Sequence, residues 1–269
     1  MRKKAGYTQK ALAEALHITD KAVSKWERGL SLPDTSLLPK LSLILDTDIE
    51  AIISKSIEEE DWVGLIALAD CDFSQPVFDK PLISYLLSHY LLLGITEIYI
   101  VTSESNEVYI KTGNYDRLGL DIRFGKPIDR KAMIIDHPWF LFGSDLTQQF
   151  RGAMLSERDT KLIPDNQMPV VYFSRNINDY YLNKTMFADL ASKRTLGRGM
   201  ICFDLGRHES FRDAATFIKA YQTNSGLLIG SLEEIAFTRR IISKEELGEY
   251  CKIVPYGELL SRVGKPAVD

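Results

Sequence analysis

Apolar side chains recur every three or four positions through the first fifty-odd residues, and this spacing is typical of amphipathic helices. Thr8 is a helix-capping residue type, and Leu12, Ala15 and Leu16 follow it on one helical face. The pattern indicates a small bundle of short helices joined by short breaks. The predicted helices cover Thr8–Leu16, Asp20–Arg28, Asp34–Leu45 and Asp48–Ser54.

The second of these helices has two contrasting faces. Thr19 caps it and Gly29 ends it. Val23 and Trp26 lie three positions apart, so we expect both to pack inward. The outward positions near its start are Asp20, Lys21, Ser24 and Lys25, and there a recognition helix would meet bases and phosphates.

From about residue 63 the pattern changes to short apolar runs that alternate with amphipathic stretches. Continuous apolar strands between helices favour a mostly parallel sheet covered on both faces. The first runs and stretches are Val63–Ala69, Leu82–Leu93, Glu97–Val101, Leu120–Phe124, Trp139–Phe142 and Asp145–Leu155. Two later strands are predicted at Val170–Phe173 and Met200–Phe203, and helices at Phe211–Tyr221, Leu232–Arg240, Glu245–Cys251 and Glu258–Val263.

The two patterns predict two domains in the 269-residue chain. We expect an all-α domain over residues 1–56, a charged linker over 57–62 and an α/β domain over 63–269. No apolar run approaches the roughly 18 residues that span a bilayer, and no signal peptide is visible. Cys71, Cys202 and Cys251 are scattered, so neither a disulfide framework nor a zinc site is expected. We expect a reduced cytoplasmic protein without membrane contact.

Charge separates the same two parts. The net charge of the chain is −4, but residues 1–28 hold seven basic and three acidic side chains. Their net charge of +4 leaves −8 for the rest. A small basic surface on an acidic body is suited to contact with nucleic acid. The alternative is a helical bundle for dimerisation, with its lysines solvating one face.

The N-terminal part closely resembles the Cro-like phage-repressor (XRE) helix-turn-helix family over about residues 1–54. The matching segments are Thr8–Ala13, Thr19–Gly29 and Pro33-Asp34 with Leu37-Leu38. The resemblance implies binding to double-stranded DNA, as a homodimer that reads two half-sites. It makes Arg2 and Glu27 a structural ion pair. At the front of the chain the family has a longer first helix, of which only about one turn remains here. The DNA-binding candidates are Gln9, Thr19, Asp20, Lys21, Ser24, Lys25 and Arg28.

The larger part resembles sugar-phosphate nucleotidyltransferases of the glucose-1-phosphate thymidylyltransferase type, over about residues 63–263. The matching segments are Pro76–Leu87, Leu93–Val101, Phe203–Phe211, Leu232–Phe237 and Tyr256–Leu260. The resemblance implies a Rossmann-like α/β nucleotidyltransferase fold. It also implies an enzyme that needs a glycine-rich phosphate loop and two carboxylates that hold Mg²⁺.

Several of these catalytic parts are missing. Where the family has its glycine-rich loop, residues 68–76 hold neither glycine nor arginine, and Asp70 and Asp72 would repel a triphosphate. The family's metal segment corresponds to about Asp136–Trp139; strict register puts Pro138 at the metal position, and a shift of one or two residues supplies Asp136. Asp204 matches the second metal position, or simply caps the next loop as a strand-end aspartate. The base-recognition stretch is replaced by residues 126–131, and no sugar-binding motif remains between residues 172 and 204.

These observations favour a bacterial transcriptional regulator whose nucleotidyltransferase-like domain is a pseudoenzyme that senses a ligand or dimerises. Sugar phosphates and nucleotide sugars are the natural effectors, no catalytic residue is assigned and no cofactor is expected. One alternative is an active sugar-1-phosphate nucleotidyltransferase with a regulatory helix-turn-helix, in which Asp204 and Asp136 would hold Mg²⁺. Another is an interaction protein whose two modules bind only other proteins. His137 and His208 are expected on the surface or in loops, and Cys71 has no assigned partner.

Overall fold

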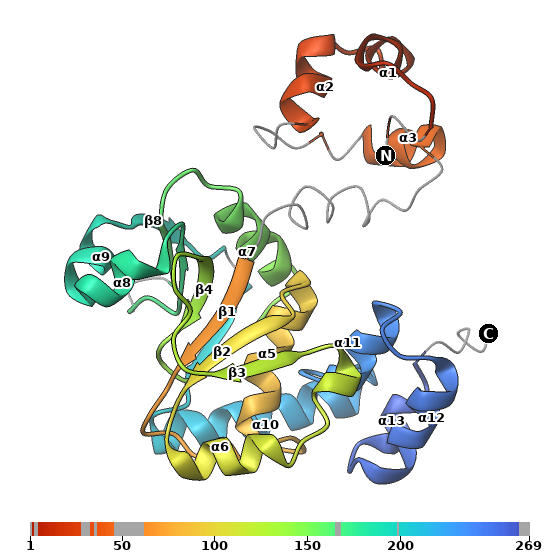
Figure 1. Ribbon diagram of the computed structural model, residues 1–269. Coiled ribbons are helices and arrows are strands. Elements are labelled where there is room, and N and C mark those ends of the chain that lie inside the picture. Colours follow the sequence, from red (N-terminus) through yellow and green to blue (C-terminus); the bar gives the residue numbers. More distant parts are fainter. Residues whose placement is uncertain are drawn as a thin grey trace. The chain divides into compact units, whose positions relative to one another are not determined.

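The computed structural model describes residues 2, 5–27, 33–34, 37–45, 62–164, 168–197 and 199–263. The chain divides into two compact units, residues 1–61 and 62–269 (Figure 1). Each unit is described by itself.

The first unit is helical. Its described helices are α1 Gln9–Leu16, α2 Asp20–Glu27 and α3 Leu38–Leu45. Thr8 caps α1 by accepting a hydrogen bond from the Ala11 amide, and His17 ends it in the left-handed conformation. The three helices enclose one apolar core, formed by Leu12, Ala13, Leu16, Val23, Leu38 and Leu41.

One helix of the first unit begins later than its apolar pattern predicted. The α-helix expected over 34–45 starts at Leu38, and the Leu37 amide bonds the Asp34 carbonyl. Pro39 explains the difference, because proline has no N–H to donate and is tolerated only in the first turn of a helix. The predicted helix over 48–54, the end of the predicted helix at Arg28 and the stop at Gly29 lie outside the described residues.

The second unit is built around a seven-stranded sheet in the order β3-β2-β1-β4-β7-β6-β8. Four of its six pairings are parallel, and only those of β7 with β4 and β6 are antiparallel, which confirms the expected mostly parallel sheet. A separate antiparallel pair joins β5 to β9, with Trp139 opposite Asp204. The elements are β1 Trp62–Ala67, α5 Leu82–Leu93, β2 Glu97–Val101, α6 Glu104–Lys111, the 3-10 helix η2 Asp116–Leu118, β3 Asp121–Phe124, β4 Lys131–Ile135, β5 Trp139–Phe142, α7 Leu146–Met154, β6 Thr160–Ile163, β7 Val171–Ser174, α8 Ile177–Leu182, α9 Lys184–Leu190, β8 Ser192–Thr195, β9 Ile201–Asp204, α10 His208–Ser225, α11 Leu232–Thr238, α12 Lys244–Ile253 and α13 Gly257–Leu260.

Apolar layers cover both faces of the sheet near its centre. Helix α5 is buried at every position except Leu92, and Tyr90 reaches the sheet, where its hydroxyl donates to the Leu65 carbonyl at 2.8 Å. Gly64 permits this approach, since a Cβ there would lie 2.8 Å from the Tyr90 ring. On the other face α8 and α9 pack Tyr180 and Phe187 against β1, β4 and β7. Among the described residues, no helix is long and apolar enough to cross a membrane.

Candidate functional site

Helix α2 exposes a polar side, and its opposite side packs into the core. Val23 is buried and Trp26 packs against the same cluster, which confirms the predicted inward pair. Thr19 caps the helix start by accepting a hydrogen bond from the Ala22 amide at 3.2 Å. Of the candidate contact residues on α2, Ser24 is half-buried, and the exposed ones are Thr19, Asp20, Lys21 and Lys25.

A polar cluster ties the start of α1 to the end of α2. The Arg2 guanidinium and the Glu27 carboxylate are 2.5 Å apart, which confirms the expected ion pair. This hydrogen bond raises the pKa of Arg2 above its ordinary value. Gln9 donates to the same carboxylate at 2.5 Å, so its side chain is held beside α2. Arg28, the remaining candidate DNA contact, lies outside the described residues.

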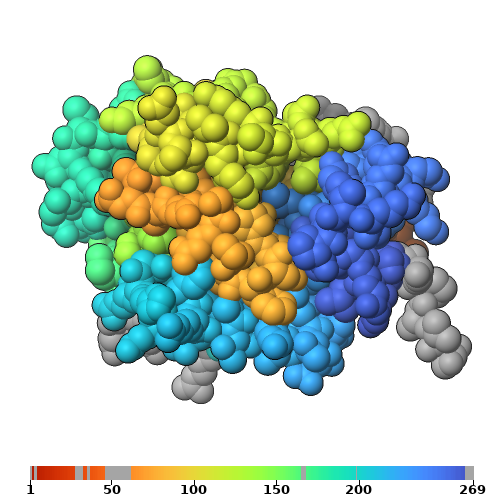
Figure 2. All heavy atoms as spheres, turned by 90° about the horizontal axis from the view of Figure 1, so that it is seen from below, coloured from red at the N-terminus to blue at the C-terminus, as the bar shows by residue number. Residues whose placement is uncertain are grey.

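In the second unit, residues 68–76 take the place of the glycine-rich phosphate loop expected after β1. Figure 2 shows the orange segment that follows β1 in the middle of the face seen from below. It lies between the yellow segment that contains α6 and the cyan segment that contains α10. Phe73 has no exposed surface, so the loop is anchored into the core.

Several backbone amides of this loop, and that of Val77 directly after it, are bonded within the unit. The Phe73 amide donates to the Asn106 side chain at 3.0 Å, and the Ser74 amide donates to the Asp72 carboxylate at 2.9 Å. The Gln75 amide bonds the Asp72 carbonyl at 3.3 Å, and the Val77 amide bonds the Lys80 carbonyl at 3.1 Å. A phosphate cradle needs amides that point at the ligand, and these four are already committed.

Asn106 is the residue that holds the loop down, and sequence reasoning did not identify it. It is buried in α6, where its amide nitrogen donates to the Cys71 carbonyl at 2.7 Å and to the Thr102 hydroxyl at 2.8 Å. Thr102 in turn donates to the Leu68 carbonyl at 2.8 Å. The sequence around Asn106 carries no apolar periodicity that singles it out, because its role depends on contacts with a distant loop.

The Asp136 carboxylate lies just beyond the end of β4 and is engaged by two side chains from the neighbouring helices. Lys184 of α9 is 2.7 Å from Oδ2, and the Tyr180 hydroxyl of α8 donates to the same oxygen at 2.8 Å. Burial is the main cause that raises the pKa of Tyr180, with Asp136 adding to the effect. Neither Lys184 nor Tyr180 was expected at this position.

The Asp204 carboxylate at the end of β9 is likewise occupied by groups of the chain itself. Its Oδ1 is 2.6 Å from His137 Nε2 and accepts the Gly206 amide at 3.0 Å. Its Oδ2 is 3.2 Å from Arg207 Nε. The bond to Gly206 is the loop-capping contact that was the alternative interpretation of this aspartate.

These contacts do not fit a Mg²⁺ centre, which takes carboxylate oxygens free to face the ion. The two candidate carboxylates face a lysine, an arginine and a histidine instead. Within the part of the chain that is described, no group of three or more His, Cys, Asp or Glu side chains could hold a metal ion.

The remaining residues singled out from the sequence are Cys71, His137 and His208, and none of them is placed as a nucleophile or a metal ligand. Burial, together with the Asp70 and Asp204 carboxylates, raises the pKa of the Cys71 thiol, which disfavours the thiolate that a nucleophile needs. His208 is the exposed first residue of α10. His137 lies in the loop between β4 and β5, as expected, where it is half-buried and contacts Asp204.

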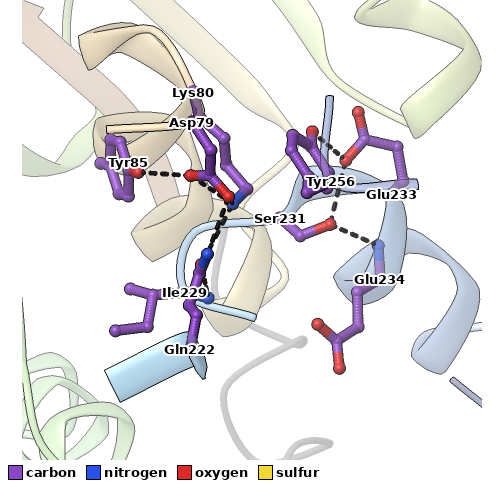
Figure 3. Close-up of polar contacts among 9 residues, drawn as sticks. All are labelled: Asp79, Lys80, Tyr85, Gln222, Ile229, Ser231, Glu233, Glu234 and Tyr256. Atoms are coloured by element: carbon purple, nitrogen blue, oxygen red, sulfur yellow. Dashed lines mark hydrogen bonds and ion pairs between the residues drawn. The ribbon is translucent and has the colours of Figure 1, made fainter. Parts of the chain in front are cut away.

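A buried polar network lies within the matched segments around Lys80 and Glu233 (Figure 3). The Lys80 ammonium is 2.9 Å from the Asp79 carboxylate and lies 3.9 Å from the centre of the Tyr256 ring. Gln222 of α10 donates to Asp79 at 2.8 Å. Burial lowers the pKa of Lys80, and the Asp79 carboxylate partly opposes this. The network joins the start of α5 to α10 and to the helices that follow. Its role is therefore structural.

Comparison with known proteins gives two different matches. The family model HTH_3 (Helix-turn-helix) matches residues 1–52. The HTH-type transcriptional regulator ImmR of Bacillus subtilis is 43% identical over 54 residues, which are 20% of this chain and 42% of that protein.

The larger part is similar to enzymes. Glucose-1-phosphate thymidylyltransferase of Neisseria meningitidis is 26% identical over 263 residues and covers 71% of this chain and 91% of its own length. That of Mycolicibacterium smegmatis is 31% identical over 248 residues and covers 66% of this chain and 85% of its own length. A solved structure from Bacillus anthracis, assigned to glucose-1-phosphate thymidylyltransferase, covers 58% of this chain and 94% of its own, with 12% identity and a TM-score of 0.44.

Proposed function

Because the chain belongs to the glucose-1-phosphate thymidylyltransferase family and carries an HTH_3 helix-turn-helix ahead of the matching region, we propose that it is a DNA-binding transcriptional regulator with a non-catalytic transferase unit. The observation that carries the proposal is a contrast between the two units. The helix-turn-helix exposes a polar helix face, whereas the loop that replaces the phosphate loop has backbone amides that already donate to Asn106 and Asp72.

The DNA-binding role is supported by the chemistry of α2. Lys21 and Lys25 are exposed cations that can neutralise phosphates, and Asp20, Thr19 and Ser24 offer groups that can meet base edges near the helix start. Val23 fixes the orientation of the helix from behind. Gln9 adds a polar group at the start of α1, as a helix that crosses the DNA backbone does.

The loss of catalysis is supported by the loop after β1 and by the two aspartates. A triphosphate needs amides and cations directed at it, and here Asn106 and Asp72 occupy the amides of Phe73 and Ser74. Asp136 and Asp204 have cations of the chain as partners. The second unit then serves to dimerise the protein or to bind a sugar-phosphate or nucleotide-sugar effector. Because the amides of Phe73 and Ser74 already have partners, we favour dimerisation over effector binding.

Fluorescence anisotropy with a labelled duplex from the region upstream of its own coding sequence tests the regulator directly. We expect the full chain to bind this duplex at least 100-fold more tightly than a scrambled duplex of the same length at physiological salt, since specific affinities exceed non-specific ones by factors of 10³ or more. Equal affinity for both duplexes would contradict a regulator that reads its own upstream region.

The competing function is an active nucleotidyltransferase, favoured by the survival of Asp136 and Asp204 in a chain that belongs to the enzyme family. Pyrophosphate release from dTTP or UTP with glucose 1-phosphate and Mg²⁺ separates the two. We expect no turnover above a blank without protein. Turnover that disappears in Asp204→Ala but persists in Asp213→Ala, an exposed aspartate of α10, would replace our proposal with the enzyme.

A further inference from the structure

The first turn of α2 exposes two neighbouring groups of opposite hydrogen-bonding character. Asp20 and Lys21 are consecutive and both exposed, and Lys25 follows Lys21 by four positions on the same side of the helix. An ionised carboxylate can only accept hydrogen bonds, and an ammonium can only donate them. The start of the helix that would face DNA therefore offers an acceptor beside a donor.

Bonds within the unit hold the Asp20 carboxylate in place and occupy only one of its oxygens. Its Oδ1 accepts the Lys21 amide at 2.8 Å. The Thr19 hydroxyl oxygen accepts the Ala22 amide at 3.2 Å and so caps the same turn. Among the described residues, neither Asp20 Oδ2 nor the Lys21 ammonium has a partner. Both groups can therefore meet a ligand.

The charge of Asp20 excludes the DNA backbone as its partner, because a phosphate repels a carboxylate. In the major groove the groups that donate hydrogen bonds are the amino groups of cytosine and adenine. The adenine amino group lies next to N7, an acceptor that repels a carboxylate, whereas the N4 amino group is the one polar group that cytosine presents there. Asp20 therefore fits cytosine better than adenine.

Lys21 needs acceptors, and guanine presents more of them than any other base. Its O6 and N7 lie side by side in the major groove, whereas adenine and thymine present one acceptor each. The residues at the start of a recognition helix contact base edges. Consecutive Cα atoms are about 3.8 Å apart and stacked base pairs about 3.4 Å apart, so Asp20 and Lys21 can reach adjacent base pairs.

We propose that each DNA half-site of this chain holds a cytosine and a guanine on adjacent base pairs. Asp20 accepts from cytosine N4, and Lys21 donates to guanine O6 and N7. Lys25, one turn farther from the helix start, contacts phosphate. This inference rests on the proposed function and deepens it, because it names the bases that the helix-turn-helix reads.

Selection of duplexes from a randomised library by the full chain, followed by sequencing, tests the two bases. We expect the enriched half-site to hold cytosine and guanine at two adjacent positions. Exchange of either base should weaken binding by about tenfold or more, as the loss of a specific base contact does. An enriched site without these two bases overturns the inference.

The substitution Asp20→Asn tests which residue reads the cytosine. Asparagine keeps an oxygen for the Lys21 amide and is as common as aspartate at helix starts. Its side chain also donates, and it pairs with N6 and N7 of adenine. We expect Asp20→Asn to select adenine where the wild type selects cytosine. Asp213→Asn, at an exposed aspartate of α10, should still select cytosine, and the inference fails if Asp20→Asn does so as well.

The substitution Lys21→Ala tests the guanine contact in the same selection. We expect the preference for guanine to fall by about tenfold, with the preference for cytosine retained. The matched control is Lys25→Ala, which should lower affinity for every duplex and leave both preferences unchanged. A Lys21→Ala variant that keeps the guanine preference and binds every duplex more weakly shows a phosphate contact and overturns the assignment. Circular dichroism shows whether each variant is folded.

These outcomes separate the inference from the proposed function. A wild type that binds DNA and enriches a site without the two bases leaves DNA binding in place and removes the inference. A wild type that binds no duplex and enriches no sequence contradicts the DNA-binding proposal itself, and the base assignment falls with it.

Discussion

His89 is a buried histidine in α5, and within the described part of the chain neither of its ring nitrogens has a hydrogen-bond partner. Its ring packs edge-on against Phe150, with the ring centres 5.7 Å apart. Burial lowers the pKa of His89 from 6.5 to about 4. The folded chain therefore keeps this imidazole neutral under conditions that protonate it in the unfolded chain.

This difference makes the stability of the second unit depend on pH. Below pH 6.5 the unfolded chain binds a proton at His89 that the folded chain does not. As the pH is lowered, the contribution of His89 to the free energy of unfolding therefore falls by about 1.4 kcal/mol per pH unit, down to about pH 4. We expect His89→Leu to remove this slope, measured by urea unfolding between pH 4 and 7. His208→Leu, at an exposed position, should keep it, and identical profiles for His89→Leu and the wild type would contradict the assignment.

Substitution of Lys25 tests the exposed side of α2 by removing one positive charge. We expect Lys25→Ala to weaken binding to every duplex by a similar factor and to reduce the dependence of log K on log salt by about one, as the loss of one phosphate contact does. Lys252→Ala, an exposed lysine of α12, is the matched control and should bind DNA like the wild type. The readout is anisotropy at several salt concentrations.

Sequence reasoning identified residues whose roles are local and missed those whose roles depend on distant contacts. Val23 and Trp26 were placed inward by their spacing. The Arg2–Glu27 pair spans 25 positions and was expected only from the family resemblance. Asn106 and Lys184 were not found, because their partners are 33–35 and 48 positions away in the chain. The pattern of one sequence carries no information about such pairs.

The loop over residues 68–76 shows how one element decides the chemistry of the second unit. It is short, it buries Phe73, and Asn106 bonds it from α6. Removing the Asn106 side chain leaves the Phe73 amide and the Cys71 carbonyl without a partner inside the protein.

We expect Asn106→Ala to lower the free energy of unfolding of the second unit by about 1–3 kcal/mol, the usual cost of unpaired buried polar groups. Chemical denaturation followed through Trp62 and Trp139 measures the loss. Asn114→Ala, at an exposed asparagine, should change it by less than about 0.5 kcal/mol. An equal effect of both substitutions would mean that the loop is held by other contacts.

Some elements with strong apolar patterns were predicted with correct bounds, as Leu82–Leu93 and Glu97–Val101 illustrate. Strand β4 was missed although its last four residues are apolar and buried. Elements without such patterns were also missed. Strand β8 has the sequence Ser-Lys-Arg-Thr and lies at the sheet edge, where charged side chains are expected and alternation is lost. Helices α8 and α9 were missed for a related reason, since they expose apolar residues on one side and bury others on the opposite side.

At the scale of the whole molecule, we assign DNA binding to the first unit and assembly to the second. Leu16 is buried in the core of the first unit. We expect Leu16→Ala to destabilise that unit by about 2–5 kcal/mol, the range for core Leu→Ala changes, and thereby to abolish DNA binding. Chemical denaturation should still show a cooperative transition of the second unit, and simultaneous loss of that transition would contradict this division of roles.

The salt dependence of duplex binding by the full chain is the most direct test of the central claim. A protein that neutralises several phosphates with lysine and arginine loses affinity as counterions compete, with a slope of log K against log salt near −0.9 per contact. We predict a slope steeper than about −3 for the upstream duplex, with specific binding retained at physiological salt. Absence of measurable binding even at low salt, or a slope near zero, would contradict the proposal that this chain is a DNA-binding regulator.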